Sequence, residues 1–286
     1  MTLFKILILA TVQGTAELLP VSSSAHVIVT AKLMHLDPSS PEMTLLLVML
    51  HTGTMFAVIV YFWKSWRVNF FSSGKTFLDF SRFVIIATAL TGIVGFTLKY
   101  VIEKVVLRNI PNAEVELLFG NLRLIAASLA AVGFLIVYAG YYHKRSKSLS
   151  SLNVKASIWI GLMQGICLPF RGFSRSGATI SAGLLSGVDK IKTEEFSFAL
   201  AVVITPPVII HSVLRLLKAH VAIILHAPEL VALFYPSMMG MIFSFISGIL
   251  ALKLLSSLLE KGRWHYFGFY CLLASCVVFM LHHSGF

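Results

Sequence analysis

Two polar stretches interrupt the apolar sequence of this chain: QGTAELLPVSSSAH at Gln13–His26 and PFRGFSRSGATIS at Pro169–Ser181. Long apolar runs flank both stretches, so the carboxylate of Glu17 and the guanidinium of Arg175 are expected at membrane depth. Ionisable groups are costly there and usually serve a function. The two stretches therefore predict the position of a functional site inside a membrane protein.

The composition is that of a membrane protein. Apolar residues make up 57% of the 286 residues and charged residues only 12%, with a mean hydropathy of +0.87, far from the balance of a soluble domain. No segment resembles a separate soluble domain, so we expect a single integral membrane domain over residues 1–286. The net charge of +11 is spread over short loops without a dense basic patch, so we expect no nucleic acid partner.

The lengths of the apolar runs predict the helices, because about 20 apolar residues cross a hydrocarbon core of about 30 Å. Six runs reach this length: Met43 to Trp63, Arg82 to Ile102, Leu117 to Tyr142, Phe196 to Leu217, Leu230 to Leu255 and Tyr266 to His282. Four runs are too short and form two pairs: Leu3 to Thr15 with Ser22 to Met34, and Val154 to Leu168 with Gly177 to Val188. We expect an all-α polytopic membrane protein with six transmembrane helices and two re-entrant helical hairpins.

The basic residues predict the orientation. If each hairpin returns to its own side, one face collects most of them and should be cytoplasmic. That face receives Lys64, Arg67, Lys75, Arg82, Lys144, Arg145, Lys147, Lys155, Lys190, Lys192, Lys253, Lys261 and Arg263. The periplasmic face receives both termini and Lys5, Lys32, Lys99, Lys104, Arg108, Arg215 and Lys218.

The same assignment reveals an inverted repeat, because a hairpin followed by three spans occurs twice from opposite sides. The halves cover about residues 1–142 and 154–286. Gln13-Gly14 in the first hairpin is echoed by Gln164-Gly165 in the second. We expect the two hairpin tips to face each other near the membrane midplane.

Both tips have the residues of an anion site. Ser22, Ser23 and Ser24 open a short helix, as N-cap residues do, and Ser174 and Ser176 flank Arg175 just before Gly177 opens another. Helix starts present unpaired N–H groups that bind phosphate. A guanidinium adds a permanent charge that suits phosphate oxygens.

The first stretch also carries an acid–base pair. Glu17 and His26 lie on either side of the turn, so the chain reversal can bring the carboxylate and the imidazole together. Such a pair can exchange a proton while a serine hydroxyl or a water molecule attacks phosphorus. Phosphoryl transfer needs chiefly positioning and charge neutralisation. The residues leave the nucleophile open.

The two motifs resemble the signatures of the bacitracin-resistance family, the undecaprenyl pyrophosphate phosphatases, and EFSFALA at Glu195–Ala201 resembles the stretch that follows the second signature. The similarity extends over essentially the whole chain. It implies a multi-pass phosphatase of the cell inner membrane that hydrolyses undecaprenyl pyrophosphate to the monophosphate at the periplasmic side. This reaction recycles the lipid carrier for cell-wall synthesis and confers bacitracin resistance. The resemblance also implies a divalent cation, Mg²⁺ or Ca²⁺.

The resemblance assigns roles by motif position. The catalytic residues would be Glu17, Ser23, His26 and Arg175. The substrate-binding residues would be Gln13, Ser22, Ser24, Arg171, Ser174, Ser176 and Thr179, with Glu17 and Gln13 as metal ligands.

This chain departs from the family pattern at three positions. Gln13 stands where many members have a second glutamate, Ala25 replaces a glycine, and Arg171 replaces the proline before Gly172. The loss of a carboxylate leaves one acidic metal ligand, although the glutamine still offers a carbonyl oxygen.

Two alternative functions differ in how well the sequence fits them. A phosphatase of the phosphatidic-acid type would need a nucleophilic histidine between Thr179 and Gly183, where the sequence has none. A transporter or flippase of polyprenyl phosphate or another anionic lipid stays open, because inverted repeats with broken helices are typical of transporters. The sequence is also compatible with a homodimer.

Polar residues outside the two motifs receive mainly structural interpretations. We interpret His51 and His211 as structural residues inside spans, although His51 could line the cavity. Glu194 and Glu195 are expected to cap a helix that begins at Phe196.

Overall fold

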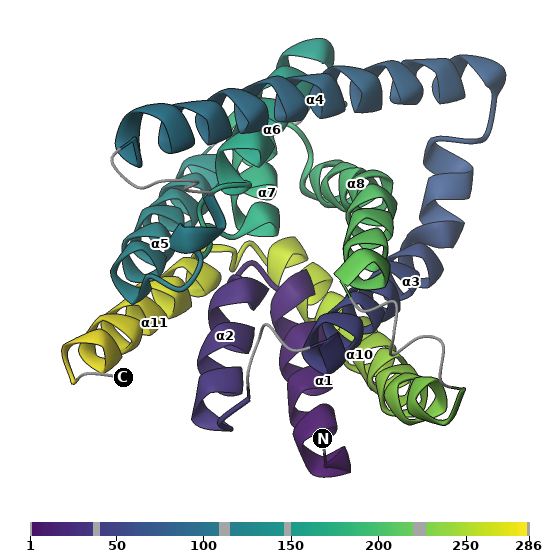
Figure 1. The fold of residues 1–286 in the computed structure, drawn as a ribbon. Helices are drawn as coiled ribbons and strands as arrows, with labels where there is room; N and C mark the ends of the chain where they lie inside the picture. The colour runs from purple at the N-terminus through teal and green to yellow at the C-terminus, as the bar shows by residue number, and fades with distance from the viewer. Residues whose placement is uncertain (1, 37–40, 109–114, 146–149, 220–226, 285–286) are drawn as a thin grey trace. The chain divides into compact units, whose positions relative to one another are not determined.

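The computed structural model describes residues 2–36, 41–108, 115–145, 150–219 and 227–284 (Figure 1). The regular elements among the described residues are helices, and one isolated bridge joins Ser150 and Val188. The helices are α1 (Leu3–Leu18), α2 (Ser23–Leu33), α3 (Pro41–Asn69), α4 (Gly74–Val101), α5 (Leu122–Arg145), α6 (Val154–Cys167), α7 (Arg175–Leu185), α8 (Lys190–Ala219), α10 (Ala227–Glu260) and α11 (His265–His283).

The predicted spans are confirmed. Among the described residues, six helices are long and apolar enough to cross a membrane: Met43–Asn69, Gly74–Val106, Leu122–His143, Lys190–Leu214, Phe234–Glu260 and His265–His283. The chain is an all-helical, multi-pass membrane protein. Of the basic residues used to predict orientation, Lys147 lies outside the described residues.

The expected helix start at Phe196 is wrong, because α8 already begins at Lys190. Glu194 and Glu195 therefore lie inside α8, where both are buried. Glu194 accepts a hydrogen bond of 2.6 Å from the hydroxyl of Ser256, and Glu195 accepts one of 3.0 Å from the amide of Asn69. These partners on α10 and α3 let the polar first turns of α8 pack inside the protein.

The helices group into two compact units. The first unit comprises Met1–Leu18, Ser23–Trp63 and Ala201–Leu255, and the second comprises Leu19–Ser22, Lys64–Leu200 and Ser256–Phe286. The first unit thus holds α1 and α2, and the second holds the turn that joins them, together with α4 to α7 and α11. The chain passes from one unit to the other within α3, α8 and α10.

In the first unit, α1 and α2 form an antiparallel pair. The ammonium group of Lys5, near the start of α1, donates to the carbonyl of Met34 just past the end of α2 at 2.8 Å. The 16 and 11 residues of these helices correspond to about 24 and about 16 Å at 1.5 Å per residue. Each helix is shorter than the hydrocarbon core of a bilayer.

Helices α1 and α3 are held against α10 within the first unit by small residues and buried hydroxyls. A side chain at Gly14 would lie 2.6 Å from the backbone oxygen of Ser244, so only glycine permits this approach. The hydroxyl of Ser244 donates to the carbonyl of Leu50 at 2.9 Å. Apolar side chains of α1, α2 and α3 complete the core: Ile6, Leu9, Ala10, Val27, Ala31, Met43, Leu46 and Leu50.

In the second unit, α6 and α7 form the other short pair. The backbone of Ser150, which precedes α6, donates to the carbonyl of Gly187 after α7 at 2.9 Å and accepts from Asp189 at 3.0 Å. The far ends of the two helices are therefore held together. On its other side α6 packs against α4, where a side chain at Gly161 would lie 2.5 Å from the backbone oxygen of Ala87.

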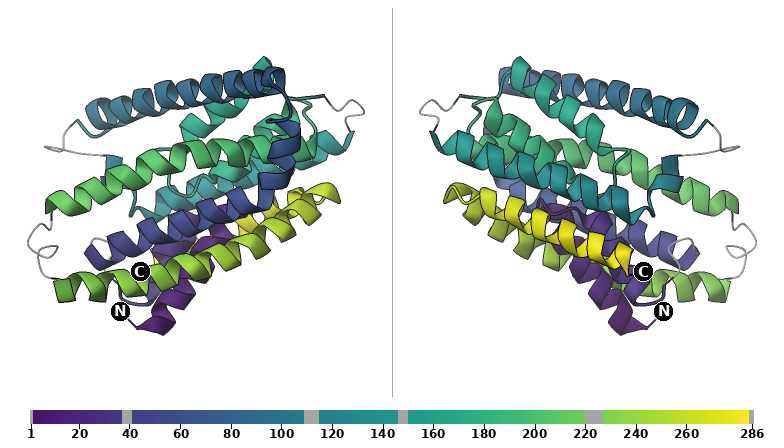
Figure 2. Two further views of the ribbon diagram at one scale, coloured as in Figure 1. Left: turned by 90° about the vertical axis from the view of Figure 1, so that its right-hand side faces the viewer. Right: turned by 90° about the vertical axis from the view of Figure 1, so that its left-hand side faces the viewer.

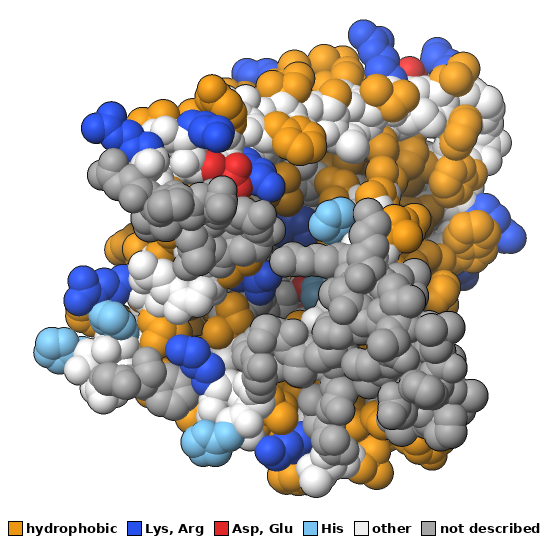
Figure 3. Space-filling model, viewed as in Figure 1, with side chains coloured by type: hydrophobic (Ala, Val, Ile, Leu, Met, Phe, Trp, Pro, Cys, Tyr) orange, Lys and Arg blue, Asp and Glu red, His pale blue; other side chains and the backbone are white. Residues whose placement is uncertain are grey.

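Helices α5 and α11 run antiparallel in the second unit, and the right-hand view of Figure 2 shows them side by side. The hydroxyl of Ser275 donates to the carbonyl of Ala126 at 2.7 Å, and Arg123 donates to His282 at 2.5 Å. Figure 3 shows hydrophobic side chains along the outer face of α4, with basic side chains near both ends. Ile85, Ile93 and Phe96 are among these exposed side chains, as expected for a helix that faces lipid.

Candidate functional site

Three polar groups approach one carboxylate oxygen of the first motif in the first unit. Glu17 lies in the last turn of α1, and Ser23 opens α2. The hydroxyl of Ser23 donates to Oε2 of Glu17 at 2.5 Å, a short charge-assisted contact. The amide of the buried Gln13, one turn earlier on α1, donates to the same oxygen at 3.3 Å.

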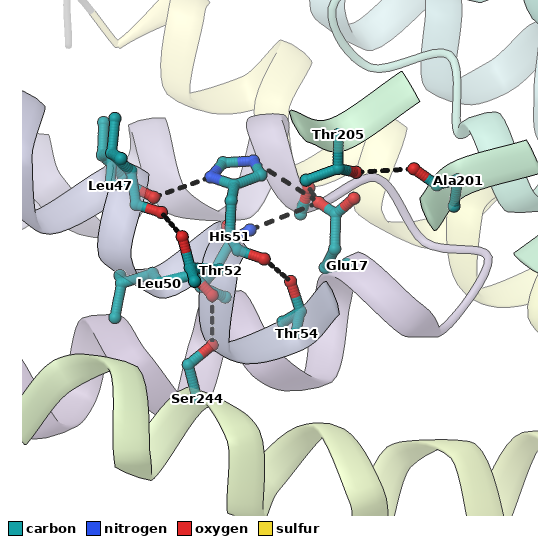
Figure 4. A network of polar contacts seen from close by, with 12 residues as sticks. Glu17, Leu47, Leu50, His51, Thr52, Thr54, Ala201, Thr205 and Ser244 are labelled. Atoms are coloured by element: carbon teal, nitrogen blue, oxygen red, sulfur yellow. Dashed lines mark hydrogen bonds and ion pairs between the residues drawn. The ribbon is translucent and has the colours of Figure 1, made fainter. Parts of the chain in front are cut away.

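The third group is His51 on α3, whose Nε2 lies 3.8 Å from Oε2 of Glu17. Its other ring nitrogen, Nδ1, is 2.8 Å from the carbonyl of Leu47 on the same helix. Figure 4 shows the ring between Leu47 and the Glu17 carboxylate. The side chains of His51 and Glu17 are 42% and 18% exposed, so water and ligands can reach this cluster.

The turn between α1 and α2, Leu19–Ser22, belongs to the second unit and contacts the second motif there. The carbonyl of Leu19 accepts a hydrogen bond from Ser176 at 3.4 Å. Ser22 is buried and has a φ of 67°, a left-handed conformation that non-glycine residues rarely adopt. Such conformations cost about 1–3 kcal/mol and cluster at functional sites.

The second motif forms the N-terminus of α7. The helix begins at Arg175, two residues before the expected Gly177, because Ser174 is its N-cap and accepts from the backbone N–H of Gly177 at 3.2 Å. The hydroxyls of Ser174 and Ser176 lie 3.4 Å apart, and both side chains are buried. The helix start and the Arg175 guanidinium together suit an anion.

Two further residues of the motif bond to the surrounding protein. The hydroxyl of the fully buried Thr179 lies 2.8 Å from the carbonyl of Arg175 and 2.6 Å from the hydroxyl of Ser197 on α8. Thr179 therefore links the first turn of α7 to α8. The guanidinium of Arg171 lies over the ring of Phe119, 4.2 Å from its centroid, in a cation–π contact.

The residues of the first motif fit a divalent cation that binds together with its substrate. Glu17 and Gln13 offer a carboxylate and an amide carbonyl, both hard oxygen donors, and Mg²⁺ often uses one or two carboxylates with substrate phosphates. In the part of the chain that the structure describes, no three His, Cys, Asp or Glu side chains cluster as a metal cage.

Comparison with known proteins covers nearly the whole chain. Residues 6–277 match the model of the family described as bacitracin resistance protein BacA. The chain belongs to the BacA family. It is 52% identical to undecaprenyl-diphosphatase 2 of Acinetobacter baylyi over 98% of each chain. It is 32% identical to the undecaprenyl-diphosphatase of Thermodesulfovibrio yellowstonii over 98% of this chain and 97% of the relative.

The structure places the predicted site residues of this BacA family member in two groups. In the first unit it joins Glu17 with Gln13 and Ser23, while Ser24 and His26 lie partly exposed on α2. In the second unit it joins Ser174, Arg175, Ser176 and Thr179 at α7, with Ser22 in the adjoining turn and Arg171 preceding the helix.

The contact of His51 with Glu17 was not predicted, since we interpreted this histidine as structural and noted only that it could line the cavity. The sequence does carry a signal, because HTGT at His51–Thr54 is a polar run inside an apolar span. The contact of Ser197 with Thr179 was also not predicted, because it joins α8 to α7 through the tertiary fold.

Proposed function

We propose that this protein is an integral membrane phosphatase that hydrolyses undecaprenyl diphosphate to undecaprenyl phosphate and inorganic phosphate. Its similarity to undecaprenyl-diphosphatases over nearly the full chain supports this activity. The reaction recycles the lipid carrier for cell-wall synthesis and would confer the bacitracin resistance for which the family is named. The single observation that carries the mechanism is the 2.5 Å contact between Ser23 and Glu17.

The Ser23–Glu17 contact suits a nucleophile and its base. The hydroxyl hydrogen already points to the carboxylate, so Glu17 can accept the proton as the serine oxygen attacks the terminal phosphorus. The bond from that phosphorus to the bridging oxygen then breaks, and undecaprenyl phosphate leaves with the electron pair. Water next attacks the phosphoserine, which breaks its bond to the serine oxygen, releases inorganic phosphate and restores the Ser23 hydroxyl. A water molecule oriented by the same groups is the alternative nucleophile. His26 would exchange the proton with the leaving group or with water.

The second motif would bind and neutralise the pyrophosphate. Arg175 and the N–H groups at the start of α7 stabilise negative charge on phosphate oxygens, and Arg171, Ser174 and Ser176 add hydrogen bond donors. Ser22 and Ser24 would contribute from the first motif. We propose that both motifs serve one substrate, because both resemble signatures of one family of phosphatases.

Glu17 and Gln13 would hold the divalent cation, Mg²⁺ or Ca²⁺. When bound, a cation would neutralise charge on the pyrophosphate oxygens. Gln13 has a second role that needs no cation, because its amide hydrogen holds Oε2 of Glu17 in place.

We also propose that the short helix pairs α1–α2 and α6–α7 are re-entrant hairpins of an inverted repeat. The helices of each pair are too short to span the membrane. The first pair is followed by the spans α3, α4 and α5, and the second pair by the spans α8, α10 and α11. In the second unit, loops assigned to one face contact each other: Ser150 bonds Gly187, and Lys190 bonds the carbonyl of Glu260. This supports a common cytoplasmic side for them.

The proposed location follows from that sidedness. The protein would lie in the cell inner membrane with its site open to the periplasm and both termini outside. A homodimer is its proposed assembly. A cysteine introduced at Lys261 should react with a membrane-impermeant maleimide only after the cells are opened, and labelling in intact spheroplasts would contradict this orientation.

A phosphate-release assay tests the proposed activity. Purified protein in detergent receives undecaprenyl diphosphate with and without Mg²⁺ or Ca²⁺. Wild type should release phosphate, and Glu17→Ala, His26→Ala and Arg175→Ala should be folded but inactive. Wild-type rates in all three variants would refute the assigned site. Movement of intact lipid between leaflets of a vesicle, without phosphate release, would support a transporter instead.

A further inference from the structure

The oxygen that accepts the Ser23 hydrogen bond has a neighbour on a third helix. Oε2 of Glu17 is approached by Ser23 from α2, by Gln13 from α1 and by His51 from α3. Nothing in the reaction proposed above uses His51. The 3.8 Å between Nε2 of His51 and Oε2 of Glu17 brings the two side chains into proximity but is too long for a direct hydrogen bond.

The orientation of the His51 ring is set by the protein. A carbonyl oxygen only accepts hydrogen bonds, so Nδ1 must carry the hydrogen in its 2.8 Å contact with Leu47. This contact fixes the plane of the ring and directs Nε2 at Glu17 (Figure 4). A backbone carbonyl behind a functional histidine is a common way to fix ring orientation.

The backbone beneath the ring is also fixed. The carbonyl of Leu50, the residue before His51, accepts from Ser244 on α10 at 2.9 Å. Two residues after His51, a side chain at Gly53 would lie 3.1 Å from the backbone carbon of Met241. Helix α3 therefore approaches α10 closely at this point, which leaves His51 little freedom to move.

We propose that His51 is a positioning residue for Glu17, which holds the carboxylate in the orientation that receives the Ser23 hydroxyl hydrogen. This role rests on the proposed phosphatase function. Glutamate has several rotatable bonds, and a reacting group displaced by about 1 Å can lose about 100-fold in rate. Because His51 acts through Glu17, its loss should lower kcat and leave KM nearly unchanged.

Two amide substitutions separate this role from packing. His51→Asn places an amide near Nδ1, so it keeps a donor for Leu47 but does not reach Glu17. His51→Gln extends its amide to the region of Nε2 and so keeps a polar group beside Glu17. The matched controls are His211→Asn and His211→Gln, because His211 is an exposed histidine on α8.

The variants are assayed for phosphate release from undecaprenyl diphosphate, with thermal unfolding in detergent as the measure of folding. We expect His51→Asn to lose about 10-fold or more in kcat with KM within about twofold of wild type. His51→Gln should stay within about threefold of wild type, and both His211 variants should be unaffected. Equal activity of His51→Asn and His51→Gln, or a rise in KM alone, would overturn the role. If wild type releases no phosphate, the proposed function itself fails.

Discussion

Replacement of Gly172 by alanine should lower both stability and activity, because this position has a backbone conformation that favours glycine and has no room for a Cβ atom. Its φ is +101°, a conformation that side chains rarely adopt. An added Cβ would also lie 2.5 Å from the backbone oxygen of Ile125 and 3.1 Å from the Cβ of Ser128. The backbone oxygen cannot move aside as a flexible side chain can.

The magnitude can be worked out with Gly187 as the matched control. Gly187 has a φ of +77°, but an added Cβ there meets nothing within 4 Å. Gly187→Ala should therefore cost only the conformational term, about 1–3 kcal/mol. Gly172→Ala should cost about 1–3 kcal/mol more, since overpacking against fixed backbone adds that amount.

Gly172→Ala should also lower the activity, because Gly172 lies two residues before Ser174, the N-cap of α7. A shift of about 1 Å at the helix start would lower phosphate release by about 100-fold, whereas Gly187→Ala should keep most activity. Stability is measured by thermal unfolding in detergent and activity by phosphate release. If Gly172→Ala and Gly187→Ala lost equal stability and equal activity, the close approach to Ile125 would be of no consequence and the reasoning would be refuted.

Three further substitutions test the two motifs. Ser22→Gly should raise unfolding stability by about 1–2 kcal/mol by relieving its left-handed conformation, and no gain in melting temperature would contradict this. Arg175→Lys keeps the positive charge but loses the planar guanidinium with its paired N–H donors, so kcat/KM for phosphate release should fall about 10-fold or more. An unchanged kcat/KM would argue against a bidentate contact with phosphate. Thr179→Val should cost about 1–3 kcal/mol in thermal unfolding, because it leaves the hydroxyl of Ser197 unpaired. Adding Ser197→Ala to that variant should restore most of the lost stability. A further, additive loss of stability would contradict the pairing.

The long apolar runs predict their helices well because membrane thickness sets a minimum length that composition alone reveals. Polar helix ends are harder to predict. The apolar run begins at Phe196, yet α8 extends back to Lys190, because Glu194 and Glu195 are buried against Ser256 and Asn69 from distant segments. Those hydrogen bonds depend on tertiary packing, so no local pattern in the sequence predicts them.

In the candidate site, too, contacts between residues close in the chain could be predicted, whereas contacts made by tertiary packing could not. Glu17 and Ser23 are close in the chain and separated by one turn, so their contact follows from local chain reversal. His51 lies 34 positions beyond Glu17 on another helix, and its contact depends on how α3 packs. Likewise, Arg171 could be recognised as a charge within the second motif, but its contact with Phe119 depends on the tertiary fold.

The pairing of Ser23 with Glu17 is the central claim, and a double-mutant cycle measures it most directly. Rates of phosphate release from undecaprenyl diphosphate are compared for wild type, Ser23→Ala, Glu17→Gln and the double variant. Residues that act as a unit have strongly non-additive effects. We predict that each single substitution lowers kcat by about 100-fold or more and that the double variant is no more than about threefold slower than the slower single variant. Multiplicative losses in the double variant, or near wild-type activity in either single variant, would contradict the claim.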